Sequence, residues 1–111
     1  MMQELMAKLA LTIDVTQKHI DDGTRGSCGA CPIALAIMDA ISGPGWAWAR
    51  VDRLAYFREI PEGKGKIEYW TADTPTAVWG FMVLFDSWLE GMPGSGPIPF
   101  RFEATFSNDR T

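Results

Sequence analysis

The C-terminal stretch of the chain alternates between apolar and polar residues, and this pattern constrains the fold more than any other feature. Apolar side chains occupy every second position, at Ile98, Phe100, Phe102, Ala104 and Phe106. Polar side chains lie between them, at Arg101, Glu103 and Thr105. Successive side chains of a β-strand point to opposite faces of a sheet, so this period of two predicts a strand with one buried face. The chain must therefore build a sheet and cover one side of it.

The N-terminal part is predicted to contain one strand and two helices. Apolar residues at alternate positions from 5 to 13 favour a strand. Thr16 is a suitable N-cap for a short helix over 17–22, which a glycine then ends. Pro32 suits the first position of a second helix, because the N–H that proline lacks would have no partner there. This second helix is predicted to continue to residue 41.

The rest of the chain is predicted to add a hairpin, a helix and the final strand. Residues 46–57 and 66–71 have strand-like composition, and a Pro- and Gly-rich turn separates them. Thr74 and Pro75 are typical of a helix start. The order β-α-β-β-α-β predicts an α+β fold, the ferredoxin-like sandwich, with two main helices on one face of a four-stranded antiparallel sheet. We expect a single domain over 1–111, with a flexible tail at 107–111.

The composition narrows the range of partners. The 111 residues are 47% hydrophobic, carry a net charge of −4 and show no basic stripe. Phosphate contacts dominate nucleic-acid binding, so a nucleic-acid partner is not expected. The longest apolar stretches are too short to span a bilayer, and the N-terminus lacks the basic leader of a secreted protein. We therefore expect a cytoplasmic protein with reduced thiols and no membrane contact.

Cys28-Gly29-Ala30-Cys31-Pro32 forms a C-x-x-C motif at a predicted helix start. The helix dipole and the free N–H groups there can stabilise a thiolate, which would permit redox chemistry. His19 and the two cysteines offer three ligands for zinc, and Asp21 or Asp22 could supply the fourth that a structural zinc site requires. The interpretation we favour is structural: Cys31 packs as a small buried residue, and Cys28 is incidental or joins it in a disulfide on oxidation.

His19, the only histidine of the chain, lies in the first turn of the short predicted helix. We expect it to bond a backbone carbonyl of the loop 24–30 and to have no role as a general base. Asp21 and Asp22 are adjacent and would point apart on a helix, and no serine or threonine lies in a nucleophile motif. The sequence therefore predicts neither an enzyme nor a bound cofactor, with zinc as the alternative.

Aromatic residues are numerous for a chain of this length, with five Trp and six Phe, and each Trp could be buried in the core or exposed on a binding surface. In the predicted strand 46–57 both faces carry apolar side chains, so one face is either covered or used for binding. Trp, Tyr and Arg concentrate at the energetic centres of protein interfaces. The candidate contact residues, for a protein partner or a homodimer, are Trp46, Trp48, Trp70 and Trp79.

The segment from His19-Ile20 through Gly23 to Cys28-x-x-Cys31-Pro32-Ile33-Ala34-Leu35-Ala36 resembles a group of small uncharacterised bacteriophage and bacterial proteins. The resemblance covers about twenty residues and implies no activity. It suggests a mobile-element setting, in which small acidic proteins often inhibit host complexes, as anti-CRISPR proteins do. The sequence thus leads us to expect a non-catalytic, phage-type protein that binds a host defence protein such as a CRISPR-Cas component in the host cytoplasm.

Overall fold

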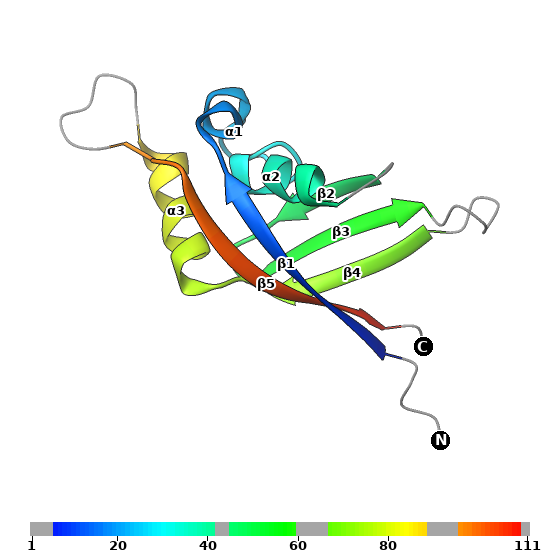
Figure 1. Cartoon of the computed structure of the whole chain (residues 1–111). Helices are drawn as coiled ribbons and strands as arrows, with labels where there is room; N and C mark the ends of the chain where they lie inside the picture. Colours follow the sequence, from blue (N-terminus) through cyan, green and yellow to red (C-terminus); the bar gives the residue numbers. More distant parts are fainter. Residues whose placement is uncertain (1–5, 42–44, 60–66, 89–95, 110–111) are drawn as a thin grey trace.

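The computed structural model describes residues 6–41, 45–59, 67–88 and 96–109 (Figure 1). Their helices and strands follow in the order β1 (Met6–Val15), α1 (Gln17–Asp22), α2 (Pro32–Ala40), β2 (Gly45–Ala49), β3 (Arg53–Glu59), β4 (Ile67–Asp73), α3 (Thr76–Ser87) and β5 (Phe100–Asp109). None of these helices is long and apolar enough to cross a membrane. The predicted turn at 61–65 and the predicted end of the third helix lie outside the described residues.

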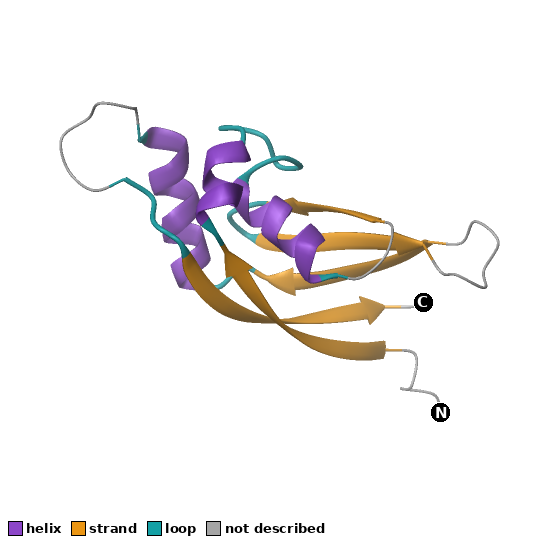
Figure 2. Ribbon diagram, turned by 45° about the horizontal axis from the view of Figure 1, so that its top comes forward, coloured by secondary structure: helices purple, strands orange, loops and turns teal. Residues whose placement is uncertain are grey.

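The five strands form one curled antiparallel sheet in the order β1-β5-β4-β3-β2 (Figure 1). The first and last strands pair over their whole length, from Met6 opposite Asp109 to Val15 opposite Phe100. The three helices lie on the same side of the sheet, as Figure 2 shows. The sheet therefore has an inner face towards the helices and an outer face on which no described helix lies.

The predicted ferredoxin-like sandwich is wrong, although the α+β class is right. Residues 46–57 form two strands, because the chain reverses at Arg50–Arg53, where each residue's backbone N–H donates to the other's carbonyl oxygen at 2.9 and 3.3 Å. This turn contains no glycine or proline, so the two strongest turn signals are missing. The sheet is antiparallel as predicted, but the extra strand gives it the order β1-β5-β4-β3-β2. The sheet has five strands, with three helices on its inner face.

The core fills the space between the inner face and the helices. Tyr56 and Phe106 are fully buried on the sheet side, and Ile33 and Ile37 of α2 are fully buried on the helix side. In β5 the alternation is confirmed, because Phe102, Ala104 and Phe106 are buried and the polar residues between them are exposed. The strand continues to Asp109, beyond its predicted end, since residues 107–109 pair with residues 6–8 of β1.

Candidate functional site

Four aromatic side chains lie on the outer face of β2, β3 and β4, and we call them the aromatic strip: Trp46, Trp48, Phe57 and Tyr69. Trp46 lies directly opposite Phe57, and Phe57 lies directly opposite Tyr69. The rings of Trp46 and Phe57 stack with centroids 4.8 Å apart, and those of Phe57 and Tyr69 lie 4.7 Å apart. Three strands therefore present one continuous row of rings.

The aromatic strip is accessible among the described residues. Trp46 is 49% exposed and Tyr69 is 43% exposed, and Ile67 beside Tyr69 is also exposed. The guanidinium of Arg50 lies 5.7 Å from the centre of the Trp48 ring and extends the strip towards the β2–β3 turn. The inner positions of β2 are the small buried residues Ala47 and Ala49, so the large side chains of this strand all point outward.

The other half of the outer face is mainly polar. The positions of β1 and β5 that alternate with the buried ones carry Lys8, Ala10, Thr12, Asp14, Arg101, Glu103 and Thr105. Arg101 and Asp14 form an exposed ion pair of 2.6 Å between the two strands. The apolar surface of the sheet is thus concentrated on β2, β3 and β4.

The four tryptophans predicted as contact residues do not form one surface. Trp46 and Trp48 belong to the aromatic strip. Trp70 is only 6% exposed, because it points inward, stacks on Tyr56 at 6.0 Å and donates from Nε1 to Glu68. It is therefore not available as a contact residue. Trp79 is 48% exposed but lies on α3, away from the sheet's outer face.

Sequence reasoning missed Phe57 because it missed the β2–β3 turn. In one continuous strand, Trp46 and Phe57 would be eleven positions apart and would point to opposite faces. In the hairpin they are register partners on the same face. A turn signal at residues 50–53 would have placed them together from sequence.

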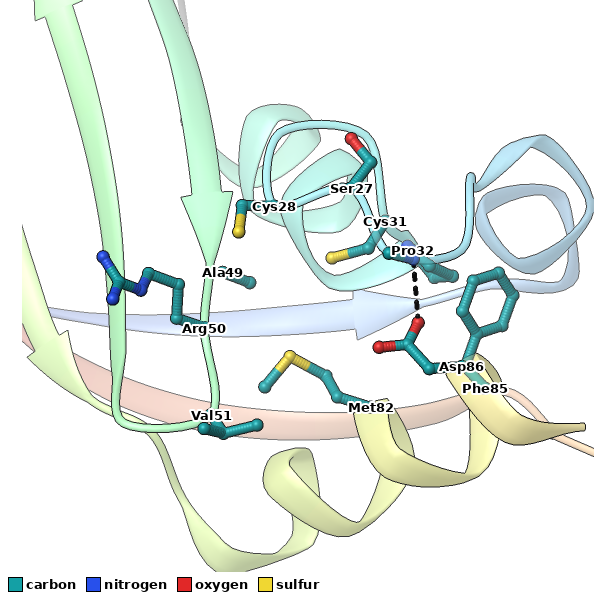
Figure 3. A pocket seen from close by; sticks show the side chains of 11 residues that line it. Ser27, Cys28, Cys31, Pro32, Ala49, Arg50, Val51, Met82, Phe85 and Asp86 are labelled. Carbon is teal, nitrogen blue, oxygen red and sulfur yellow. Dashed lines mark hydrogen bonds between the residues drawn. The ribbon is translucent and has the colours of Figure 1, made fainter.

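A cavity of about 200 Å³ lies at the start of α2, between the loop 23–31, the β2–β3 turn and α3 (Figure 3). The loop is fixed on two sides, because Ala49 N donates to the carbonyl oxygen of Cys28 at 2.9 Å and Gly26 N donates to Asp86 at 3.2 Å. Cys28, Cys31 and Met82 all line the cavity, which we therefore call the sulfur cavity. Here the two cysteines of the C-x-x-C motif lie beside Met82, which comes from the distant helix α3.

The two cysteines are free and differ in environment. Cys28 is exposed, whereas Cys31 is the buried N-cap residue of α2. Burial raises the pKa of the Cys31 thiol, and this outweighs the lowering effect of the N–H groups of Ala34 and Ile33. A lowered pKa was the sequence-based argument for thiolate chemistry, and the direction for Cys31 is the opposite.

His19 lies apart from the cysteines and stabilises the short helix α1. Its Nδ1 accepts from the backbone N–H of Thr16 at 3.0 Å, and its backbone N–H donates to the Thr16 hydroxyl at 3.3 Å, which completes a capping box. With Nδ1 as acceptor, Nε2 carries the proton and donates to Asp39 at 2.6 Å. The structural role is as predicted, but its partners are Thr16 and Asp39 instead of the loop carbonyls.

The predicted zinc set is not assembled. Among the described residues, which include His19, Cys28 and Cys31, no three His, Cys, Asp or Glu side chains form a group that could hold a metal ion. The imidazole is instead held by Thr16 and Asp39. A metal ion at the sulfur cavity would therefore need at least one ligand that is not His, Cys, Asp or Glu.

No protein-family model, curated protein or solved structure matches this chain. Its function is therefore inferred from the geometry of the aromatic strip and of the sulfur cavity.

Proposed function

We propose that this protein is a non-catalytic binding protein whose aromatic strip contacts a partner protein. The observation that supports the proposal is the row of Trp46, Phe57 and Tyr69, which crosses three strands with ring centroids less than 5 Å apart and remains about half exposed at both ends. Large exposed apolar patches are uncommon on proteins that act alone, and they mark interaction surfaces.

The strip has the properties of a favourable contact surface. Its rings are held by stacking and by the sheet, so few side-chain rotamers remain to be fixed on binding. Trp, Tyr and Arg are the residue types that contribute most to binding energy at interfaces, and Trp46, Tyr69 and Arg50 supply one of each. The partner is expected to offer apolar pockets that receive these rings.

The charge of the chain favours a different protein as partner over a second copy. The net charge is −4, so two copies repel each other while a basic surface is attracted. A partner with apolar pockets surrounded by Lys and Arg fits both the rings and the charge. The sequence resemblance to small phage proteins leads us to propose a host defence complex, such as a CRISPR-Cas complex in the cytoplasm of the host cell, as the first class of partner to test.

A pair of matched variants tests the proposal. Trp46 and Trp79 are equally exposed, at 49% and 48%, but lie on different surfaces. The wild-type chain, Trp46→Ala and Trp79→Ala would each be immobilised and used to capture bacterial proteins for quantitative mass spectrometry. We expect a basic partner that the wild type and Trp79→Ala retain and that Trp46→Ala loses. Equal capture by all three chains, or loss with Trp79→Ala alone, would refute the role of the strip.

Sedimentation of the purified chain tests the homodimer alternative. We expect a monomer at micromolar concentration, because two copies that each carry a net charge of −4 repel each other. A dimer that Trp46→Ala converts to a monomer would show that the strip binds another copy of the chain instead of a different protein.

A further inference from the structure

Three sulfur atoms from three parts of the chain point into the sulfur cavity. Cys28 comes from the loop before α2, Cys31 from the N-cap of α2, and Met82 from the middle of α3. Figure 3 shows both thiols and the thioether directed towards the same space. Met82 is 51 positions from Cys31 in the sequence, so the tertiary fold alone brings this third sulfur to the motif.

We propose that the sulfur cavity is a binding site for Cu(I), with the thiolates of Cys28 and Cys31 and the thioether of Met82 as ligands. Thiolate and thioether sulfur are soft donors, and soft donors select Cu(I). A structural zinc site requires four ligands from Cys, His, Asp or Glu, and the described part of the chain does not group even three of them. The thioether is the donor that distinguishes the two ions.

The environment of the cavity suits a monovalent ion held by two thiolates. On binding, each thiol releases its proton to solvent and forms a copper–sulfur bond, while Met82 donates a lone pair and loses no proton. Two thiolates and one Cu(I) carry a net charge of −1. The backbone N–H groups of Ile33 and Ala34 at the start of α2 face Cys31, whereas the carboxylate of Asp86, which also lines the cavity, opposes a negative charge there. The N–H groups stabilise the negative charge of the bound complex.

The ion has a route to the site and a rigid frame around it. Cys28 is exposed, so a thiol is available to the incoming ion at the mouth of the cavity. Cys31 and Met82 are buried, at 6% and 7% exposure, and hold the inner side. The hydrogen bonds from Ala49 to Cys28 and from Gly26 to Asp86 fix the loop against β2 and α3 before any ion binds. This arrangement is independent of the aromatic strip.

The test is competition for Cu(I) between the full chain and a coloured Cu(I) chelator, under reducing and anaerobic conditions, with native mass spectrometry for stoichiometry. We expect one Cu(I) per wild-type chain and none for Cys28→Ser/Cys31→Ser. Serine is a good N-cap residue, so the double variant keeps the start of α2, and circular dichroism would verify this. Met82→Leu conserves the volume of the core and should weaken Cu(I) binding at least tenfold.

Met38→Leu is the matched control, because Met38 packs against the core from α2 but does not line the cavity. It should bind Cu(I) within twofold of the wild type. The proposal is overturned if the wild type takes no Cu(I) from the chelator, or if Met82→Leu and Met38→Leu bind it equally well. It is also overturned if Zn²⁺ binds one per chain with an affinity that Met82→Leu leaves unchanged.

Discussion

Replacing Trp46 with alanine removes the more exposed of the two indole rings of the aromatic strip from the surface that a partner would cover. A buried tryptophan removes up to about 250 Å² from water. Because 49% of Trp46 is exposed in the free chain, a partner can cover about half of that area, roughly 120 Å². At about 25 cal/mol per Å² the lost contact corresponds to about 3 kcal/mol. The dissociation constant should therefore rise on the order of 100-fold.

Isothermal titration calorimetry with the captured partner would measure this change. Trp79→Ala removes an equally exposed indole from α3 and should change the dissociation constant by less than about threefold, the size of most effects outside an interface's centre. Trp46→Ala also loses its stacking on Phe57, which costs about 0.5–1.5 kcal/mol of stability, so urea unfolding must show that the variant is folded during the titration. A folded Trp46→Ala chain with wild-type affinity would refute the reasoning.

Three further changes test individual parts of the structure. The Tyr56 hydroxyl is buried without a hydrogen-bond partner among the described residues, so Tyr56→Phe should raise the free energy of unfolding by about 1 kcal/mol in urea titrations, and a loss of that size would show a missed partner. Thr16→Ala should lower the free energy of unfolding by about 1 kcal/mol because the cap of α1 is lost. Thr76→Ala, at an exposed position at the start of α3, should have less effect, and equal losses would count against the capping box. Burial raises the pKa of Cys31 above its ordinary value of 9.0, so iodoacetamide should alkylate Cys31 more slowly than the exposed Cys28. The rate at Cys31 should still increase above pH 9.0, which peptide mapping over a pH series would show. Equal rates for the two cysteines at neutral pH would contradict this.

The elements with strong local signals were predicted well from sequence. The helix 17–22 was placed with its correct bounds, because a threonine N-cap and a terminal glycine define both ends locally. Pro32 marked the start of α2, and alternation identified β1 and β5. Each of these signals depends on residues within one or two turns of one another, so no tertiary information was needed.

The candidate sites depended on contacts that sequence patterns do not report. The turn at Arg50–Arg53 contains no glycine or proline and is closed by backbone hydrogen bonds, so strands β2 and β3 were taken for one. That error hid Phe57 from the strip and gave a four-stranded sheet. The two hydrogen-bond partners of the His19 ring differ in the same way. Thr16 is three residues away, within reach of a local capping pattern, whereas Asp39 is twenty residues away, and no local pattern indicates that contact.

The sequence by itself determined that this chain forms helices and strands with one buried face each. The spacing of apolar residues and the capping residues that indicate these elements involve only a few neighbouring positions. The tertiary structure decided which strands are neighbours, and so which aromatic rings form the strip and which methionine faces the C-x-x-C motif. The physical reason is that strand pairing and helix docking are long-range contacts, chosen by the packing of the whole core, and local composition carries little information about them.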